Sequence, residues 1–306
     1  MALSPSLGIP EHYVRSFEKN WNHTVQQELS KLKDRVTVTE FEGKEKVMTD
    51  LDQVTFTERQ GRLTNSTPTE ATGKARKITK RDFKCQVIFD RKDKDLLGNL
   101  SRPDSELIME MKMAWQRKMD ALIVEAASAT VYGGEEPYVT AITLPSSQQV
   151  AVNYVPTGSP ANNGLTPEKI INARRIFREN HQDPNMEDIF LAMSPEDEEF
   201  LMTYIKSSGN DVWANMLAKS EETNVLFGFK KVCITQLTLN SSTDIETAIA
   251  WSKRRGIYVA PEKMQIEIDS LPTKDHAIQI SAYADYGAVR RYEEGVVEIF
   301  ADHSPA

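Results

Sequence analysis

The sequence predicts an α+β protein, and three observations lead to this fold class. Apolar residues at three- and four-residue steps predict one long amphipathic helix over residues 103–128. Alternation of apolar and polar residues predicts a pair of strands within residues 276–300. Between them, residues 136–270 mix helix-start signals with short apolar strands, which is typical of a domain that combines helices with a sheet.

Length and composition limit the class of protein. The 306 residues, 40% of them hydrophobic, suffice for one large or two modest domains. The formal net charge of −8 argues against nucleic-acid binding by the whole surface. The N-terminus lacks the pattern of a secretory signal, and no apolar run reaches the ~20 residues that span a bilayer. We therefore expect a soluble protein made inside the cell, with no membrane partner.

The first ten residues predict a loose arm, and a helix is predicted after them. Pro10 opens a helical pattern, and Gly43 ends an alternating segment that begins near Arg35 and predicts a strand. The apolar stripe of the helix consists of Val14, Phe17, Trp21, Val25, Leu29 and Leu32.

Residues 53–84 are polar, rich in threonine and poor in core residues. Their flanks, near residues 53–59 and 74–82, predict strands, and their middle predicts a flexible tip. The segment has a net charge of +5, so the rest of the chain carries −13. Its eight basic residues are Arg59, Arg62, Lys74, Arg76, Lys77, Lys80, Arg81 and Lys84. An isolated hairpin is marginally stable in water, which favours docking on a partner, although a solvated loop remains an alternative.

The long helix follows an apolar strand that begins near residue 83. Ser101 and Pro103 supply a cap and an early proline, and Gly133 and Gly134 follow the helix. At 1.5 Å per residue, a helix over 103–128 is about 36 Å long, enough to cross a small domain. Its apolar stripe is Ile108, Met111, Trp115, Met119, Leu122 and Ala126.

The remaining elements alternate between helices and strands. Helices are predicted for residues 166–181, 194–207 and, as a short one, 212–218. Strands are predicted near residues 188–193, 228–239, 246–260 and 264–271, before the final pair. The connection of that final pair carries the charged residues Arg290, Arg291, Glu293 and Glu294.

A search for catalytic chemistry finds none. The chain has no phosphate-binding glycine motif, and its five histidines are isolated. The adjacent Asp302, His303 and Ser304 cannot form a hydrogen-bonded triad, and the acids at 196–199 are explained by the helix dipole rather than by a metal. Cys85 and Cys233 each lie in an apolar stretch and predict buried free thiols. We therefore predict a non-enzyme with no catalytic residue, no cofactor and no metal site.

Two stretches resemble a known family. Residues 101–134, SRPDSELIMEMKMAWQRKMDALIVEAASATVYGG, are similar to the spine helix of tailed-bacteriophage major capsid proteins, and a polar two-stranded loop precedes them as in that family. Residues 248–299, from AIAW through YGAVR to VVEI, look like the closing section of the same family. The order and spacing of these patterns carry the resemblance, which covers nearly the whole chain.

The resemblance implies a Hong Kong 97-like capsid fold. The family has an N-terminal arm, an extended E-loop, a P-domain with the spine helix and an A-domain. Carried onto this chain, the implied ranges are 1–33 for the arm with its helix, 34–49 for a P-domain strand, 50–84 for the E-loop, 85–135 for the P-domain with the spine helix at about 103–128, 136–275 for the A-domain, and 276–306 for the return to the P-domain.

The implied function is that of a major capsid protein. Such a chain self-assembles as pentamers and hexamers into the icosahedral shell that encloses the double-stranded DNA of a tailed phage. We expect assembly in the host cytoplasm, location in the virion, a separate scaffolding protein, a portal and no sequence-specific DNA binding. The sequence leaves open whether a decoration protein is a further partner. An encapsulin-type cargo shell of the same fold remains an alternative, as does a soluble enzyme or nucleic-acid-binding protein with a basic arm.

Two groups of charged residues are the predicted intersubunit contacts. The first group is the eight basic residues of the E-loop named above. The second lies on the spine helix and the C-terminal turn and consists of Glu106, Glu110, Glu125, Arg290, Arg291, Glu293 and Glu294. We expect the basic loop to meet the acids of a neighbouring subunit, with charge determining register more than affinity.

Overall fold

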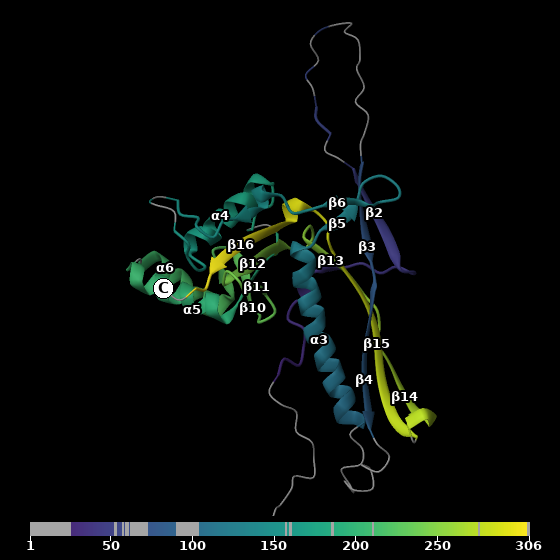
Figure 1. Cartoon of the computed structure of the whole chain (residues 1–306). Helices are drawn as coiled ribbons and strands as arrows, with labels where there is room; N and C mark the ends of the chain where they lie inside the picture. The colour runs from purple at the N-terminus through teal and green to yellow at the C-terminus, as the bar shows by residue number, and fades with distance from the viewer. Residues whose placement is uncertain are drawn as a thin grey trace, which may run out of the picture.

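A long helix lies against long strands on one side of the molecule, and a helix-covered sheet lies on the other (Figure 1). The computed structural model describes residues 26–51, 54–56, 58, 61, 73–89, 104–156, 158, 161–184, 187–209, 211–274 and 276–304. Within these residues the strands form three sheets of five, seven and four strands. The predicted mixed fold class is confirmed.

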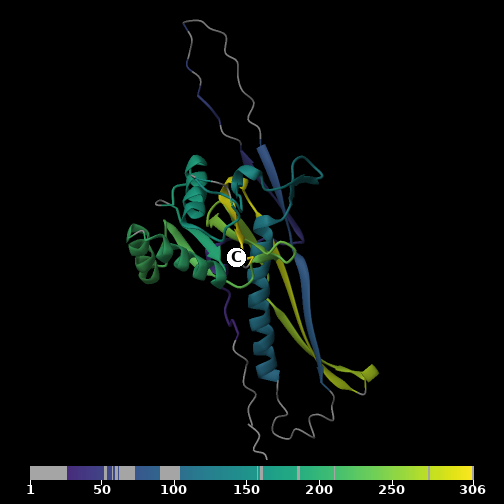
Figure 2. The same ribbon diagram turned by 60° about the vertical axis from the view of Figure 1, so that its left-hand side comes forward.

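Helix α3 (Asp104–Ser128) is the predicted spine helix and begins within one residue of the expected position. Figures 1 and 2 both show it running alongside β4 (Arg81–Phe89) and β15 (Ala277–Arg290). Its predicted apolar stripe is buried at Met111, Met119 and Leu122. Trp115 is half-buried and meets the ring of Tyr286 edge-on, with 6.1 Å between ring centroids.

The first sheet is built around β15. Strands β13 (Ile257–Pro261) and β14 (Gln265–Leu271) pair with different parts of β15, β4 pairs with its other side, and β1 (Thr37–Val38) pairs with β13. The side chains of Ile280, Ala282 and Tyr286 are at most 5% exposed. The alternating core face predicted for this last long strand is confirmed, because these residues contribute to the cores that contain α3.

A four-stranded sheet has the order β2 (Glu45–Leu51), β3 (Gly73–Thr79), β5 (Val131–Gly133) and β6 (Thr140–Ile142). Strands β2 and β3 are antiparallel, and their last pair is Leu51 with Gly73. Gly133 lets β5 approach β3 closely, since a Cβ at this position would lie 2.1 Å from the carbonyl oxygen of Ala75. The sheet therefore forms the base from which residues 52–72 depart.

The seven-stranded sheet is covered on both faces. Its order is β7 (Gln149–Val150), β16 (Val296–Asp302), β12 (Ile245–Ser252), β8 (Ile189–Met193), β10 (Phe229–Cys233) and β9 (Val225–Leu226), with β11 (Thr238–Asn240) paired to β12. Phe190 and Trp251 share one core with α3, whereas Leu191 and Ala250 share another with α4 (Pro167–Glu179) and α5 (Pro195–Ser208). Every residue of β8 is buried, which explains its short, wholly apolar sequence.

The helix-start signals behave as predicted. Thr166 caps α4 through a hydrogen bond from the Lys169 backbone, and Ser194 and Asp197 form a capping box at α5. Helix α6 (Asp211–Thr223) extends beyond the short segment predicted there. The described residues also include the short 3₁₀ helices η1 (Lys33–Arg35), η3 (Ser146–Gln148), η4 (Pro272–Lys274) and η5 (Glu293–Gly295). No helix among the described residues is long and apolar enough to cross a membrane.

Several local predictions are wrong. Residues 26–32 are irregular rather than helical, and the rest of the predicted arm helix lies outside the described residues. The strand predicted near residues 53–59 does not include residues 54–56, which have no regular structure. The strand of this region lies earlier, at β2. Cys85 is a free but exposed thiol, because β4 is only partly covered, and Cys233 is free and half-buried. Apolar neighbours in sequence do not ensure burial at a partly covered strand.

The pairing of the strands crosses the boundaries of the implied domain ranges, which stay a prediction. Residues 73–84, placed in the E-loop, belong to β3, to β4 and to Lys80, which joins the two strands. Strands β13 and β14, placed in the A-domain, pair with β15, and β16, placed with the last segment, pairs with β12. Local patterns locate strands but contain little information about partners far along the chain.

Candidate functional site

Six of the eight predicted basic contact residues are described, and these six lie on β3, on β4 or between the two strands. Arg59 and Arg62 lie outside the described residues. Arg76 is 4% exposed and forms an ion pair with Glu293. Lys80 is 9% exposed and donates to the Phe41 carbonyl at 2.9 Å. These two side chains therefore join parts of one chain.

The other described basic residues are more accessible. Lys77 lies 3.4 Å from a Glu45 carboxylate oxygen, and Lys84 is exposed. Arg81 donates to both oxygens of Glu125 at 2.9 and 3.2 Å. Arg81 and Glu125 were predicted to face different subunits, yet they join β4 to α3 within one chain. An exposed pair of this kind contributes little to stability, about 0–1 kcal/mol.

The remaining acids of the spine helix have different surroundings. The side chain of Glu106 lies outside the described residues. Glu110 accepts a hydrogen bond from Gln26 at 2.5 Å, which fixes the irregular segment 26–32 against α3. Whether Glu106, Glu110 and Glu125 contact a neighbouring subunit stays a prediction.

Arg290 lies in the interior, not at the surface turn that the sequence suggested. It is 0% exposed, and its guanidinium donates to the carbonyl oxygens of Ala127 at 2.6 Å and Ala129 at 3.0 Å. These carbonyls lie at the end of α3, where helix carbonyls lack intrahelical partners. Burial lowers the pKa of Arg290, opposed by the nearby Glu293 carboxylate. Arg290 thus satisfies the C-terminal end of the spine helix.

Arg291 is also held by contacts within the chain. Its guanidinium lies 5.4 Å from the ring centroid of Tyr258 and 5.6 Å from that of Tyr292, and it forms an ion pair with Asp50. Glu293 is half-buried, whereas Glu294 is exposed. Sequence reasoning missed Asp50 and Tyr258, because nothing local links them to this turn.

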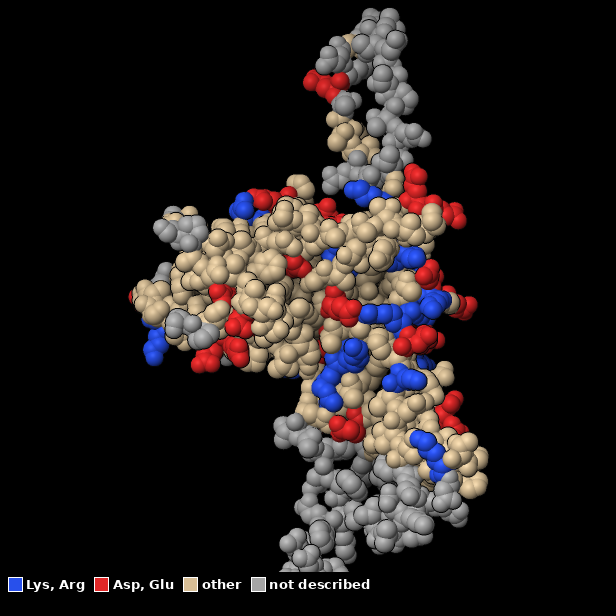
Figure 3. Space-filling view, viewed as in Figure 1, with Lys and Arg blue, Asp and Glu red and all other residues tan. Residues whose placement is uncertain are grey.

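A recess of about 830 Å³ brings several predicted residues together. Lys74, Arg76, Arg291, Glu293 and Glu294 line it, together with the end of α4 and the β12–β13 turn. On the face that Figure 3 shows, acidic and basic side chains lie close together rather than in separate patches. The predicted contact residues therefore converge at a mixed-charge surface between two of the sheets.

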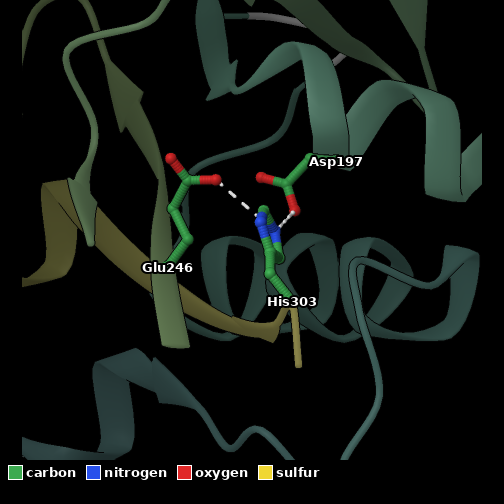
Figure 4. Close-up of side chains that lie close together, drawn as sticks. All are labelled: Asp197, Glu246 and His303. Carbon is green, nitrogen blue, oxygen red and sulfur yellow. Dashed lines mark hydrogen bonds and ion pairs between the residues drawn. The ribbon is translucent and has the colours of Figure 1, made fainter. Parts of the chain in front are cut away.

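A second group of charged residues was not predicted as a site. Asp197 of α5, Glu246 of β12 and His303 after β16 point toward one another (Figure 4). His303 Nε2 lies 2.9 Å from Asp197 Oδ1 and 3.4 Å from Glu246 Oε2, and Nδ1 lies 3.0 Å from Glu196 Oε2. The hydrogen bond to Asp197 raises the pKa of His303 to about 9, and burial raises the pKa of Glu246.

Lys169 lies beside this group and is 0% exposed. Its ammonium donates to the carbonyl oxygens of Asn163 at 2.6 Å, Gly164 at 2.9 Å and Phe300 at 2.8 Å. Burial lowers the pKa of Lys169 to about 8, since desolvation disfavours the charged form. The side chain joins the segment before α4 to β16.

The lowered pKa of Lys169 predicts a pH dependence of stability. Between pH 8 and the ordinary pKa of 10.5, the folded chain binds fewer protons at Lys169 than the unfolded chain. The free energy of unfolding should therefore rise across this window, by about 2 kcal/mol. Urea unfolding of the wild type and of Lys169→Met at several pH values measures this, because other titrating groups affect both chains alike. Parallel stability curves for the two chains would contradict the expectation.

Phage capsid chains of known structure share this fold. The capsid of Ralstonia phage GP4 matches with a TM-score of 0.70 and 10% identity over 100% of both chains. The capsid of cyanophage P-SCSP1u matches with a TM-score of 0.69 and 15% identity over 98% of this chain and 96% of that chain. The capsid of cyanophage Pam1 matches with a TM-score of 0.68 and 10% identity over 100% of both chains. At these identities the likeness establishes the fold.

The sequence family decides the identity. Residues 9–302 match the family described as phage capsid protein. The chain belongs to the phage capsid protein family. No curated protein sequence matches it. The predictions of a Hong Kong 97-like fold and of a major capsid protein are confirmed, and the encapsulin and enzyme alternatives are not favoured.

Membership in the family shows where this capsid protein is located and what it assembles with. It is a structural component of the virion, and it assembles with copies of itself. The family is one of structural proteins rather than enzymes. The interior positions of Arg76, Lys80 and Arg290 therefore serve the stability of the single subunit on which assembly depends.

Proposed function

We propose that this capsid protein forms the icosahedral shell, as hexamers and pentamers, around the double-stranded DNA of a tailed phage. The observation that carries the proposal is the agreement over the whole chain between its fold and capsid chains such as that of Ralstonia phage GP4. In this proposal, α3 and the sheet around β15 form the P-domain, and the seven-stranded sheet with α4, α5 and α6 forms the A-domain.

Residues 52–72 are proposed to form the part of the E-loop that docks on a neighbouring subunit. The loop departs from the paired ends of β2 and β3. Apolar side chains at its base are unusually accessible, with Leu51 83%, Val54 75% and Phe56 105% exposed. Exposed apolar clusters are typical of interaction surfaces, so a neighbour that covers them would gain buried apolar area.

The accessible predicted residues are the proposed polar contacts around this docking. Lys77, Lys84 and Glu294 remain exposed or half-buried in the single subunit, unlike Arg290. Charges of this kind contribute more to register and partner choice than to affinity. A separate scaffolding protein and a portal are further proposed partners, and DNA is enclosed without sequence-specific binding.

Assembly of the purified chain tests the proposed function. Expression alone, and with a scaffolding protein from the same phage, should give closed particles in negative-stain microscopy and in light scattering. Particles formed during infection should contain nuclease-protected DNA. A chain that stays monomeric under all of these conditions would contradict the shell proposal, and particles filled with an enzyme instead of DNA would favour the cargo-shell alternative.

A further inference from the structure

Three potential metal ligands converge from separate elements. Asp197 lies in the first turn of α5, Glu246 lies on β12, and His303 follows β16. One ligand atom from each residue lies within 4.8 Å of the other two. His303 and Asp197 are 106 residues apart in the chain, so only the folded subunit brings them together.

The burial of the two carboxylates requires compensation. The side chains of Asp197 and Glu246 are 0% and 10% exposed, and both face the same imidazole. Two like charges buried side by side are unfavourable unless cations balance them, and the single imidazole of His303 can carry at most one positive charge. Lys169 does not balance them by contact, because its ammonium donates to three backbone carbonyls. Among the described residues, His303 is the ion-pair partner found for Glu196, Asp197 and Glu246.

The two distances from His303 to the carboxylate oxygens fit a small divalent metal ion. Zinc lies about 2.0–2.2 Å from imidazole nitrogens and carboxylate oxygens, so neighbouring ligands of a tetrahedral ion are about 3.3 Å apart. His303 Nε2 lies 2.9 Å from the Asp197 oxygen and 3.4 Å from the Glu246 oxygen. Small side-chain adjustments would place an ion between the three atoms.

The surroundings also orient the ligand atoms, as they do in metal sites. Nδ1 of His303 lies 3.0 Å from Glu196, and a carboxylate on the second ring nitrogen commonly orients a metal-binding imidazole. The capping box holds the Asp197 carboxylate independently, because Oδ2 accepts from the Ser194 backbone at 3.4 Å. That bond leaves Oδ1 directed at His303.

We propose that Asp197, Glu246 and His303 bind a zinc-class divalent metal ion, with a water molecule as the fourth ligand. The ion would join the chain after β16 to α5 and β12, and so stabilise the helix-covered sheet of the capsid subunit. The residue types fit, since imidazole and carboxylate together favour zinc over magnesium or calcium, which prefer oxygen ligands alone. This role is separate from shell formation and does not depend on it.

Zinc binding by the full chain tests the proposal. The chain is treated with a chelator, dialysed against zinc chloride and analysed for bound metal, with affinity measured by calorimetry. We expect one zinc ion per chain, at least a 100-fold weaker affinity in His303→Ala, and a 10- to 100-fold weaker affinity in Glu196→Gln, which removes only the orienting carboxylate. Glu199→Gln is the matched control, because Glu199 is an exposed residue of the same helix.

Two results would overturn the proposal. One is a wild-type chain that binds no stoichiometric zinc, and the other is a His303→Ala chain that binds it with unchanged affinity. If circular dichroism shows that His303→Ala does not fold, the zinc affinity of Glu196→Gln becomes the deciding measurement. Glu196 is exposed, so its replacement should leave the fold intact. Cobalt substitution gives a second readout, since a tetrahedral site should produce visible absorption in the wild type and in Glu199→Gln.

Discussion

A capsid chain in which Asn-Gly replaces residues 52–72 should fold normally and form no shells. Leu51 and Gly73 are the last antiparallel pair of β2 and β3, so a two-residue turn can connect them. The replacement removes the proposed docking segment, together with Arg59 and Arg62, but leaves the four-stranded sheet intact. Each subunit would then lose one contact to a neighbour, and a closed shell multiplies that loss over every subunit.

Folding and assembly are measured separately in this test. We expect urea unfolding to give a free energy within about 1 kcal/mol of the wild type, because no buried contact of the described residues is removed. The yield of closed shells in negative-stain microscopy should fall to zero. In a control chain, Gly-Ser-Gly-Ser replaces residues 64–67, so the loop keeps its length. This chain should still assemble if the docking contacts are made by the rest of the 52–72 segment. Normal shells from the shortened chain would disprove docking by this loop.

Charge reversal of the basic segment would be a poorer experiment. Arg76 and Lys80 are at most 9% exposed and have partners in Glu293 and Phe41. Acidic residues at these positions would be buried without cations and would unfold the subunit. A loss of particles would then say nothing about contacts between subunits.

The sequence predicts the elements of this capsid protein better than their arrangement. Helix α3 and the core face of β15 follow from apolar periodicity, which is a local property of the chain. The pairing of β16 with β12 joins residues about 50 positions apart in register, such as Val296 with Trp251. No local pattern specifies that choice, so the sequence does not predict which strands cross between sheets.

The local sequence also does not predict which charged side chains are buried or which partners they have. Arg290 and Arg291 sit beside Glu293 and Gly295, a pattern typical of an exposed turn. Their burial results from distant groups, namely the end of α3 and the pair Asp50 and Tyr258. Likewise, His303 looks like an isolated histidine until β12 and α5 bring carboxylates to it.

Replacement of Arg290 by Met should strongly destabilise the subunit. The change leaves the carbonyl oxygens of Ala127 and Ala129 without their donor, and it leaves Arg76 as the ion-pair partner of Glu293. Each unsatisfied buried group costs about 1–3 kcal/mol, so the free energy of unfolding should fall by about 3 kcal/mol or more. Urea unfolding of the purified subunit measures the loss, and fewer shells should form because less folded chain is available.

The control for Arg290→Met is the same substitution at an exposed arginine nearby. Arg254 lies in the β12–β13 turn and is exposed, so Arg254→Met should change the free energy of unfolding by no more than about 0.5 kcal/mol. Arg290→Lys should lie between the two, because an ammonium keeps the charge but loses the fork that reaches both carbonyls. If Arg290→Met were as stable as Arg254→Met, the guanidinium would not be what satisfies the end of the spine helix. Water molecules would then have to donate to the carbonyl oxygens of Ala127 and Ala129, and Arg290 would remain a candidate for the intersubunit contact that the sequence alone suggested.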